Sequence, residues 1–152
     1  MKRTALRVNG ISDVSTVKQD IQDIVREIVI ARDRACILAD NGMFGGSGVP
    51  NCNGYANDGH LILQADHLIT RGNSATYADT RLIVCLCKGH HGWKKWNEQR
   101  YNEVVRTVIS PDRVALWDRC HADRYTAHRT SLYDWQLALA ALKQELRQYV
   151  AP

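Results

Sequence analysis

The sequence predicts a small α+β fold, in which two strands and a helix form a core that is flanked by helices at both ends. Two short apolar runs of strand type, at 61–66 and 82–86, lie in the middle of the chain, and stretches with apolar residues at helical spacing precede and follow them. Cysteines and histidines gather around these two runs. The length of 152 residues fits one domain over 1–152, with the core at about 34–108 and helical extensions at 15–33 and 110–150.

The first helix is predicted from Ser15 to Asp33, where apolar residues recur on one face. Thr16 and Gln19 fit a capping box, in which the hydroxyl and the amide each satisfy a free backbone N–H at the helix start.

After this helix, residues 39–59 are rich in Gly, Asn and Asp and predict a long loop. A loop of this length in a compact domain needs an anchor or a function. Beyond the two strand-like runs, a single helix is predicted from about Gly89 to Val108, with Trp93 and Trp96 in the core.

Two more helices are predicted near the C-terminus. Ser110 followed by Pro111 is typical of a helix start, and Ser131 with Asp134 begins the last helix. The last helix carries a heptad-like seam of Leu132, Trp135, Leu139, Leu142, Leu146 and Tyr149. The seam predicts packing on the rest of the domain, with a homodimer through this helix as the alternative.

Composition narrows the class of protein. The net charge of +4 and the pI of about 8.9 are mildly basic, which is compatible with nucleic-acid binding but does not require it. The sequence contains no run of about 18 apolar residues, and its basic start, MKRTALRVNGISD, lacks the apolar stretch and the cleavage site of a secretory signal. We therefore expect a soluble, cytoplasmic protein.

Four residues have the types expected of a structural zinc site, which takes four N/S ligands. The chain has five cysteines, an odd number that argues against a purely disulfide framework and favours metal binding. Cys87 and His90 form a Cys-x-x-His knuckle that can supply two ligands from one turn, and Cys36 and Cys52 can supply two more across the long loop. The alternatives are that Cys85 replaces one of these ligands, or that the thiols are simply buried.

A second group of residues combines Asp66, His67 and His91. Adjacent side chains at the end of a strand point to opposite sides of the backbone, so Asp66 can bind a hard cation while His67 faces a water. His91, at the start of the following helix, can add a nitrogen ligand. Phosphodiester hydrolysis needs a cation that stabilises charge on the phosphate and a base that activates water. The order strand, Asp-His, loop, strand, Cys-x-x-His-His, helix therefore predicts hydrolysis that depends on Mg²⁺ or Mn²⁺.

The segment ADHLITRGNSATYADTRLIVCLCKGHHGWKKW resembles the core of the HNH (ββα-metal) endonucleases, in particular phage recombination nucleases of the Rap/NinG type. The upstream VREIVIARDRAC is similar to the helix that leads to that family's first zinc cysteine, so the resemblance covers roughly 24–97. It implies a DNA endonuclease of a bacterial or phage-infected cell, acting on branched, recombination or phage DNA. In that pattern Asp66 and His91 hold the catalytic cation, His67 is the general base, and the four Cys/His ligands hold structural zinc.

The segment departs from the family's pattern in three ways. The first cysteine pair is split by the Gly-rich insertion, and His90 stands where the family usually has Cys. Leu82 stands where the family has the central Asn of its name. That Asn usually shapes the loop through hydrogen bonds, a role for which Asn73 and Asp79 are the candidates here.

Four basic residues are predicted to contact the phosphate backbone of DNA. Arg71 lies in the loop after the first strand, and its planar guanidinium matches phosphate oxygens. Lys94, Lys95 and Arg100 lie on the predicted core helix, which in the resembled fold is near the cleaved strand. The alternative for each is an ordinary solvent-facing charge.

Two functions from other classes fit part of this pattern. A zinc-stabilised DNA-binding module without activity would keep the four zinc ligands but would not need Asp66 or His67. A structural zinc protein would bind a protein partner through the seam of its last helix. The presence of Asp66, His67 and His91 together favours the enzyme.

Overall fold

The computed structural model describes residues 13–39, 48–126 and 128–150, and over these residues it confirms an α+β architecture with five helices and a two-stranded sheet. In chain order the elements are α1 (Val14–Asp33), β1 (Leu63–His67), the 3-10 helix η2 (Thr80–Leu82), β2 (Ile83–Cys87), α2 (Lys88–Lys94), α3 (Glu98–Val108), α4 (Pro111–Ala122) and α5 (Leu132–Val150). Both predicted strands are confirmed, each displaced by one or two residues toward the C-terminus. None of the described helices combines the length and apolar character that crossing a membrane requires.

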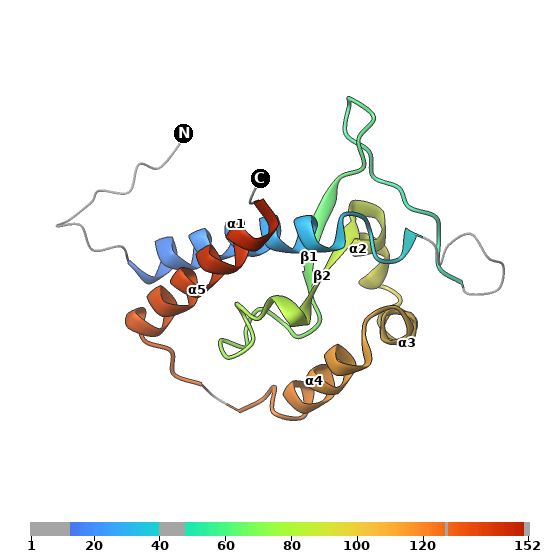
Figure 1. Ribbon diagram of the computed structural model, residues 1–152. Coiled ribbons are helices and arrows are strands. Elements are labelled where there is room, and N and C mark those ends of the chain that lie inside the picture. Colours follow the sequence, from blue (N-terminus) through green and yellow to red (C-terminus); the bar gives the residue numbers. More distant parts are fainter. Residues whose placement is uncertain (1–12, 40–47, 127, 151–152) are drawn as a thin grey trace.

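The hairpin of β1 and β2 lies between two layers of helices (Figure 1). The strands pair antiparallel, with His67 opposite Ile83. Every residue of β2 is buried, because alternate side chains enter different layers. Val84 and Leu86 pack with residues of α3 and α4, whereas Ile83 and Cys85 pack with residues of α1 and α5. Burial of both faces explains why this strand is continuously apolar in sequence.

Helix α5 lies along α1, and the two helices together cover one face of the hairpin (Figure 1). The seam predicted in the last helix packs on α1 through Trp135, Leu139 and Leu142, which are all buried. Ser131 and Asp134 cap α5 as predicted: the N–H of Ser131 donates to the Asp134 carboxylate at 2.8 Å, and the N–H of Asp134 donates to Oγ of Ser131 at 3.2 Å.

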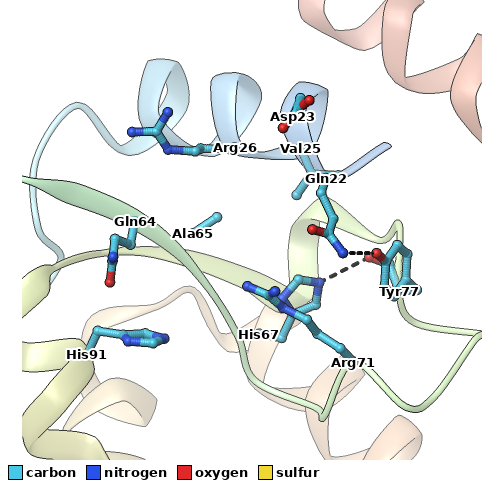
Figure 2. Close-up of a pocket in the computed structure, with 10 residues that line it drawn as sticks. All are labelled: Gln22, Asp23, Val25, Arg26, Gln64, Ala65, His67, Arg71, Tyr77 and His91. Atoms are coloured by element: carbon cyan, nitrogen blue, oxygen red, sulfur yellow. Dashed lines mark hydrogen bonds between the residues drawn. The ribbon is translucent and has the colours of Figure 1, made fainter. Parts of the chain in front are cut away.

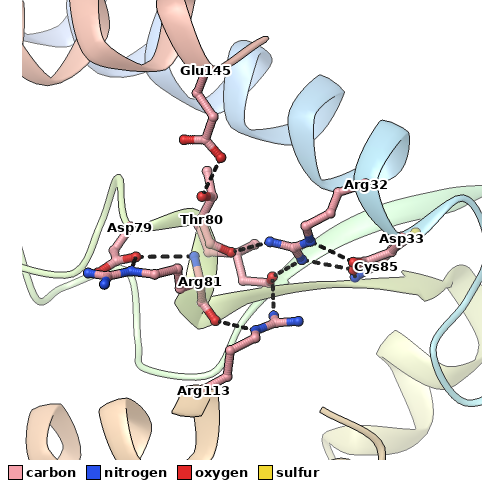
Figure 3. Close-up of polar contacts among 9 residues, drawn as sticks. Arg32, Asp33, Asp79, Thr80, Arg81, Cys85, Arg113 and Glu145 are labelled. Carbon is pink, nitrogen blue, oxygen red and sulfur yellow. Dashed lines mark hydrogen bonds and ion pairs between the residues drawn. The ribbon is translucent and has the colours of Figure 1, made fainter. Parts of the chain in front are cut away.

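Side chains from α1 and α4 satisfy the backbone of β2 along its outer edge (Figure 3). Arg32 and Arg113 both donate to the carbonyl of Ile83, at 2.8 and 3.0 Å. Oδ2 of Asp33 accepts the N–H of Cys85 at 2.9 Å. An edge strand needs such partners for its free backbone groups. These contacts fix the part of β2 that pairs with the end of β1, where the candidate site lies.

The predicted cap of the first helix is wrong. Asp13, not Thr16, is the N-cap residue, and its carboxylate accepts the N–H of Thr16 at 2.8 Å. Gln19 instead donates to Asp23, one turn further along the exposed face. Asp and Thr are both good N-cap residues. Because α1 begins at Val14, Asp13 is the residue that precedes it, and Thr16 already lies inside the helix.

The single helix predicted after the second strand is also wrong, because α2 and α3 are separate helices joined at Lys95–Asn97. The side-chain amide of Asn97 donates to the carbonyl of Trp93 at 3.0 Å, which satisfies one of the free carbonyls at the end of α2. Trp93 packs partly buried against the core as predicted, but Trp96 lies in the junction and is 87% exposed. The prediction that Trp96 belongs to the core is therefore wrong.

Candidate metal centre and hydrolytic site

The four predicted zinc ligands meet in one cluster. Cys36 follows α1, Cys52 belongs to the long loop, Cys87 ends β2 and His90 lies in the first turn of α2. Their donor atoms all lie within 4.8 Å of one another. Nδ1 of His90 is 3.2 Å from the sulfurs of Cys36 and Cys87, and 3.7 Å from that of Cys52. Ligands of a tetrahedral zinc ion lie about 3.3–3.8 Å apart, so this cluster could bind a metal such as zinc.

The ring of His90 is oriented for this role by a backbone carbonyl. Nε2 of His90 lies 2.7 Å from the carbonyl oxygen of Pro50, which can only accept a hydrogen bond. The proton of the neutral ring is therefore on Nε2, and Nδ1 presents its lone pair to the three sulfurs. This is the usual arrangement of a histidine that ligates zinc.

The thiols of the cluster differ in acidity. Burial raises the pKa of Cys36 and raises that of Cys52 to about 12. Burial also opposes ionisation of Cys87, but hydrogen bonds from the backbone N–H groups of His90 and Asn53 and from the thiols of Cys52 and Cys36 together outweigh it, and the pKa of Cys87 is lowered. Because metals bind the thiolate form, Cys87 is the ligand best prepared for a cation.

Cys85, the competing ligand, lies outside the cluster. It is fully buried among side chains of α1 and α5, on the opposite face of the hairpin from Val84 and Leu86. Burial there raises the pKa of Cys85 to about 12. Cys85 and Cys87 are two residues apart and would share one face of a regular strand. Because β2 ends at Cys87, the Cys87 side chain turns to the metal cluster while that of Cys85 stays against α1 and α5.

Two glycines let the long loop approach the cluster, and no pattern in the sequence marks them for this role. Gly54 has φ of +90°, and a Cβ added there would lie 2.7 Å from Cβ of Lys88. A Cβ on Gly89 would lie 1.8 Å from Oδ1 of Asn53, and the N–H of Gly89 donates to the carbonyl of Asn53 at 3.1 Å. This close contact between two backbones brings Cys52 to the start of α2.

Asp66, near the end of β1, lies beside His91 of α2. Oδ1 of Asp66 is 3.4 Å from Nε2 of His91. Asp66 is only 5% exposed, and its Oδ2 accepts hydrogen bonds from the hydroxyl of Tyr101 and the ammonium of Lys94, both at 2.7 Å. Tyr101 is fully buried on α3, and nothing in the sequence marked it as a partner of Asp66. Lys94, predicted to contact phosphate, pairs with this carboxylate instead.

His67 takes the opposite side of β1, as the alternation of a strand predicts. Its Nε2 lies 3.1 Å from the carbonyl oxygen of Tyr77, so the proton of the neutral ring is on Nε2. Nδ1, which then carries the free lone pair, is buried and has no hydrogen-bond partner among the described residues. Burial lowers the pKa of His67, and the charges of Arg71 and Lys94 lower it further. The neutral form needed for a general base is thereby favoured.

A pocket of about 230 Å³ opens in front of His67 (Figure 2). Arg71 lines it, as does His91 from α2, and Gln22 and Arg26 of α1 form its other wall. Gln22 also hydrogen-bonds the hydroxyl of Tyr77 (Figure 2). His91 lines a second hollow of about 250 Å³ as well, together with Asp66, Lys94, Lys95 and Glu98. The imidazole of His91 is thus the side chain common to the pocket of His67 and the hollow of Asp66.

The remaining predicted residues are dispersed. Lys95 is exposed on the rim of the second hollow, whereas Arg100 lies on α3 and pairs with Glu103 at 2.9 Å. Asn73 shapes the loop after β1, since its side chain accepts the N–H of Ala75 at 3.0 Å and donates to the carbonyl of Arg124 at 3.3 Å. Asp79 caps η2. Both candidates for the loop-shaping role therefore hold part of this loop.

Sequence families, curated proteins and solved structures were each compared with the chain, and none matches it.

Proposed function

We propose that the chain is a metal-dependent DNA endonuclease of the HNH (ββα-metal) type, with structural zinc held by the cluster of Cys36, Cys52, Cys87 and His90. The observation that carries the proposal is the position of His91. It contacts the carboxylate of Asp66 and also lines the pocket of His67, so that this one side chain connects the hollow of Asp66 with the pocket of the candidate base.

Asp66 and His91 are suited to a hard divalent cation such as Mg²⁺ or Mn²⁺. Two ligands about 2.1 Å from one octahedral ion, at right angles, are about 3.0 Å apart, and Oδ1 of Asp66 lies 3.4 Å from Nε2 of His91. Tyr101 and Lys94 both occupy Oδ2, which leaves Oδ1 directed at His91. A divalent cation at this position would stabilise negative charge on the phosphate and on the leaving oxygen.

His67 supplies the base. Nδ1 of His67 has no exposed surface in this structure, so a shift of the side chains around it must first admit a water. That water would donate a hydrogen bond to Nδ1 and attack phosphorus as its proton passes to Nδ1, and the bond from phosphorus to the leaving oxygen would break. The carbonyl of Tyr77 accepts a hydrogen bond from Nε2–H throughout and so holds the ring in the correct tautomer. Arg71 and Arg26, on two walls of the pocket, supply positive charge for the phosphate.

One observation favours a second function, a zinc-stabilised DNA-binding module without activity. The carboxylate of Asp66 is already neutralised by Lys94 and hydrogen-bonded by Tyr101. A buried ion pair of this kind also serves as a purely structural contact. The two functions differ in whether the chain cuts DNA at all.

The deciding experiment is a cleavage assay with the full chain on supercoiled plasmid and on branched DNA, with and without added Mg²⁺ or Mn²⁺. The zinc content is measured in each sample, because chelators that remove Mg²⁺ would also strip the structural site. The endonuclease proposal predicts cleavage only with added cation. Asp66→Asn, which keeps the volume of the side chain, should lose cleavage, whereas Asp58→Asn, at an exposed carboxylate of the loop, should not. A chain that contains zinc and binds DNA but cuts no form with either cation is the non-catalytic module.

A further inference from the structure

Trp96 projects from the junction between α2 and α3 and is 87% exposed, more than any other large apolar side chain among the described residues. The junction that carries it is well fixed. The N–H groups of Lys95, Trp96 and Asn97 donate to three successive carbonyls of α2, at 3.3, 3.1 and 3.1 Å. An isolated exposed apolar residue is ordinary on a protein surface. The hollow and the charges beside Trp96 are what indicate a binding role.

The indole borders a hollow of about 360 Å³, whose other lining residues are Asn97, Glu98, Gln99, Arg100 and Glu103. Glu98 also lines the hollow that contains Asp66 and His91. The two hollows therefore adjoin, and Trp96 lies one hollow away from the candidate cation ligands.

The two hollows differ in charge: the one that contains Asp66 and His91 also has lysines suited to a phosphate, and the one beside Trp96 is suited to a neutral ring. Lys94 and Lys95 lie on the side of the hydrolytic residues. The hollow beside the indole instead has the carboxylates of Glu98 and Glu103 against the single cation of Arg100. Its negative balance disfavours a phosphate, while an aromatic face with amide groups nearby is suited to a nucleobase.

We infer that Trp96 is a stacking platform for an unpaired base close to the scissile phosphate, so that the chain binds a single-stranded region of DNA more tightly than a duplex. The inference rests on the proposed function and specifies its substrate. Bases inside a duplex are covered on both faces by their neighbours, and only an unpaired base offers a free face to an indole. The exposed Lys95 contacts the DNA backbone, and the indole of Trp96 favours an unpaired base over a paired one.

The test compares binding of a single-stranded oligonucleotide with binding of the matching duplex, without added divalent cation so that no cleavage occurs. Stacking on an aromatic side chain is worth enough to make Trp96→Ala bind single-stranded DNA roughly 5- to 150-fold more weakly. Duplex binding should change by less than about 2-fold, on the same reasoning. Trp96→Phe should recover part of the loss. Tyr125→Ala is the matched control, since Tyr125 is 83% exposed on the connection between α4 and α5.

Two results would overturn the inference: no loss of single-stranded binding in Trp96→Ala, or an equal loss on single strand and duplex. The second result would make Trp96 a general contact to DNA. The outcome is separable from that of the proposed function. If wild type cuts DNA and Trp96→Ala binds single strands normally, only the stacking inference fails. If Trp96→Ala loses single-strand binding selectively but wild type cuts nothing, the stacking site remains and the endonuclease proposal fails.

Discussion

Replacement of Cys87 by Ser should release the bound zinc and destabilise the chain. The cluster joins three segments that are far apart in sequence, because Cys87 and His90 come from a single turn. The hairpin it supports has only two strands among the described residues. Structural zinc sites bind with about 10–16 kcal/mol, which is as large as the whole stability of a typical native protein, about 5–15 kcal/mol. If the substitution weakens zinc binding about 1,000-fold, mass action lowers the stability by about 4 kcal/mol. For a chain of this length that corresponds to a fall in Tm of roughly 8–16 °C.

The assay is metal analysis of purified protein together with thermal unfolding followed by circular dichroism. Wild type should contain about one zinc per chain, as expected for one tetrahedral site, and Cys87→Ser should contain none. Cys120→Ser is the matched control, because Cys120 lies on α4 outside the cluster. Cys85→Ser should also keep its zinc, although a hydroxyl in that buried position will cost some stability. Well-folded wild type without zinc, or a Cys87→Ser chain with full zinc and unchanged Tm, would refute the reasoning.

Three further predictions concern the surroundings of the site. Gly89→Ala should lose zinc affinity and stability because its Cβ would collide with Asn53, whereas Gly92→Ala on the same helix, with nothing within 4 Å of an added Cβ, should retain both in the same metal and melting assays. Tyr101→Phe should lower the free energy of unfolding by about 1.5–3 kcal/mol, the worth of a hydrogen bond to a charged group, and an unchanged urea midpoint would contradict this. Lys95→Ala should reduce the slope of log affinity for DNA against log salt by about one unit, and an unaltered slope would remove Lys95 from the interface.

The sequence predicted well those features that depend on residue type and local spacing. The strand-like runs, the knuckle of Cys87 and His90, and the opposite directions of Asp66 and His67 follow from short-range patterns. Cys36 and Cys52 are predicted as zinc ligands from their residue type alone, since their spacing is not that of a knuckle. Cys52 reaches the cluster because the backbone of the long loop lies against the start of α2, and Gly54 and Gly89 permit this close contact.

The sequence could not predict contacts that arise only when elements pack. Tyr101 lies 35 positions after Asp66 and contacts it from α3. Arg26 lines the pocket of His67 because α1 packs along one wall of that pocket. The sequence does not predict the break between α2 and α3, because the apolar spacing continues through it and the cap is a single amide of Asn97. The same spacing wrongly predicts Trp96 in the core.

The pH dependence of cleavage tests the state of His67. Only the neutral ring can accept a proton, so the rate should rise as pH increases through the pKa of His67 and then level. Burial lowers that pKa from 6.5, so the plateau should begin at a lower pH than for an exposed histidine. A rise centred above 6.5 would show that another group limits the rate.

The most direct test of the central claim is the cleavage rate of His67→Ala, compared with wild type at saturating Mg²⁺ or Mn²⁺. Loss of a general base slows a reaction roughly a hundred- to ten-thousand-fold. We expect a decrease in that range in a chain that still folds, retains zinc and binds DNA, with no rescue by additional cation because a metal ion cannot replace the missing base. Cleavage by His67→Ala at the wild-type rate would contradict the account.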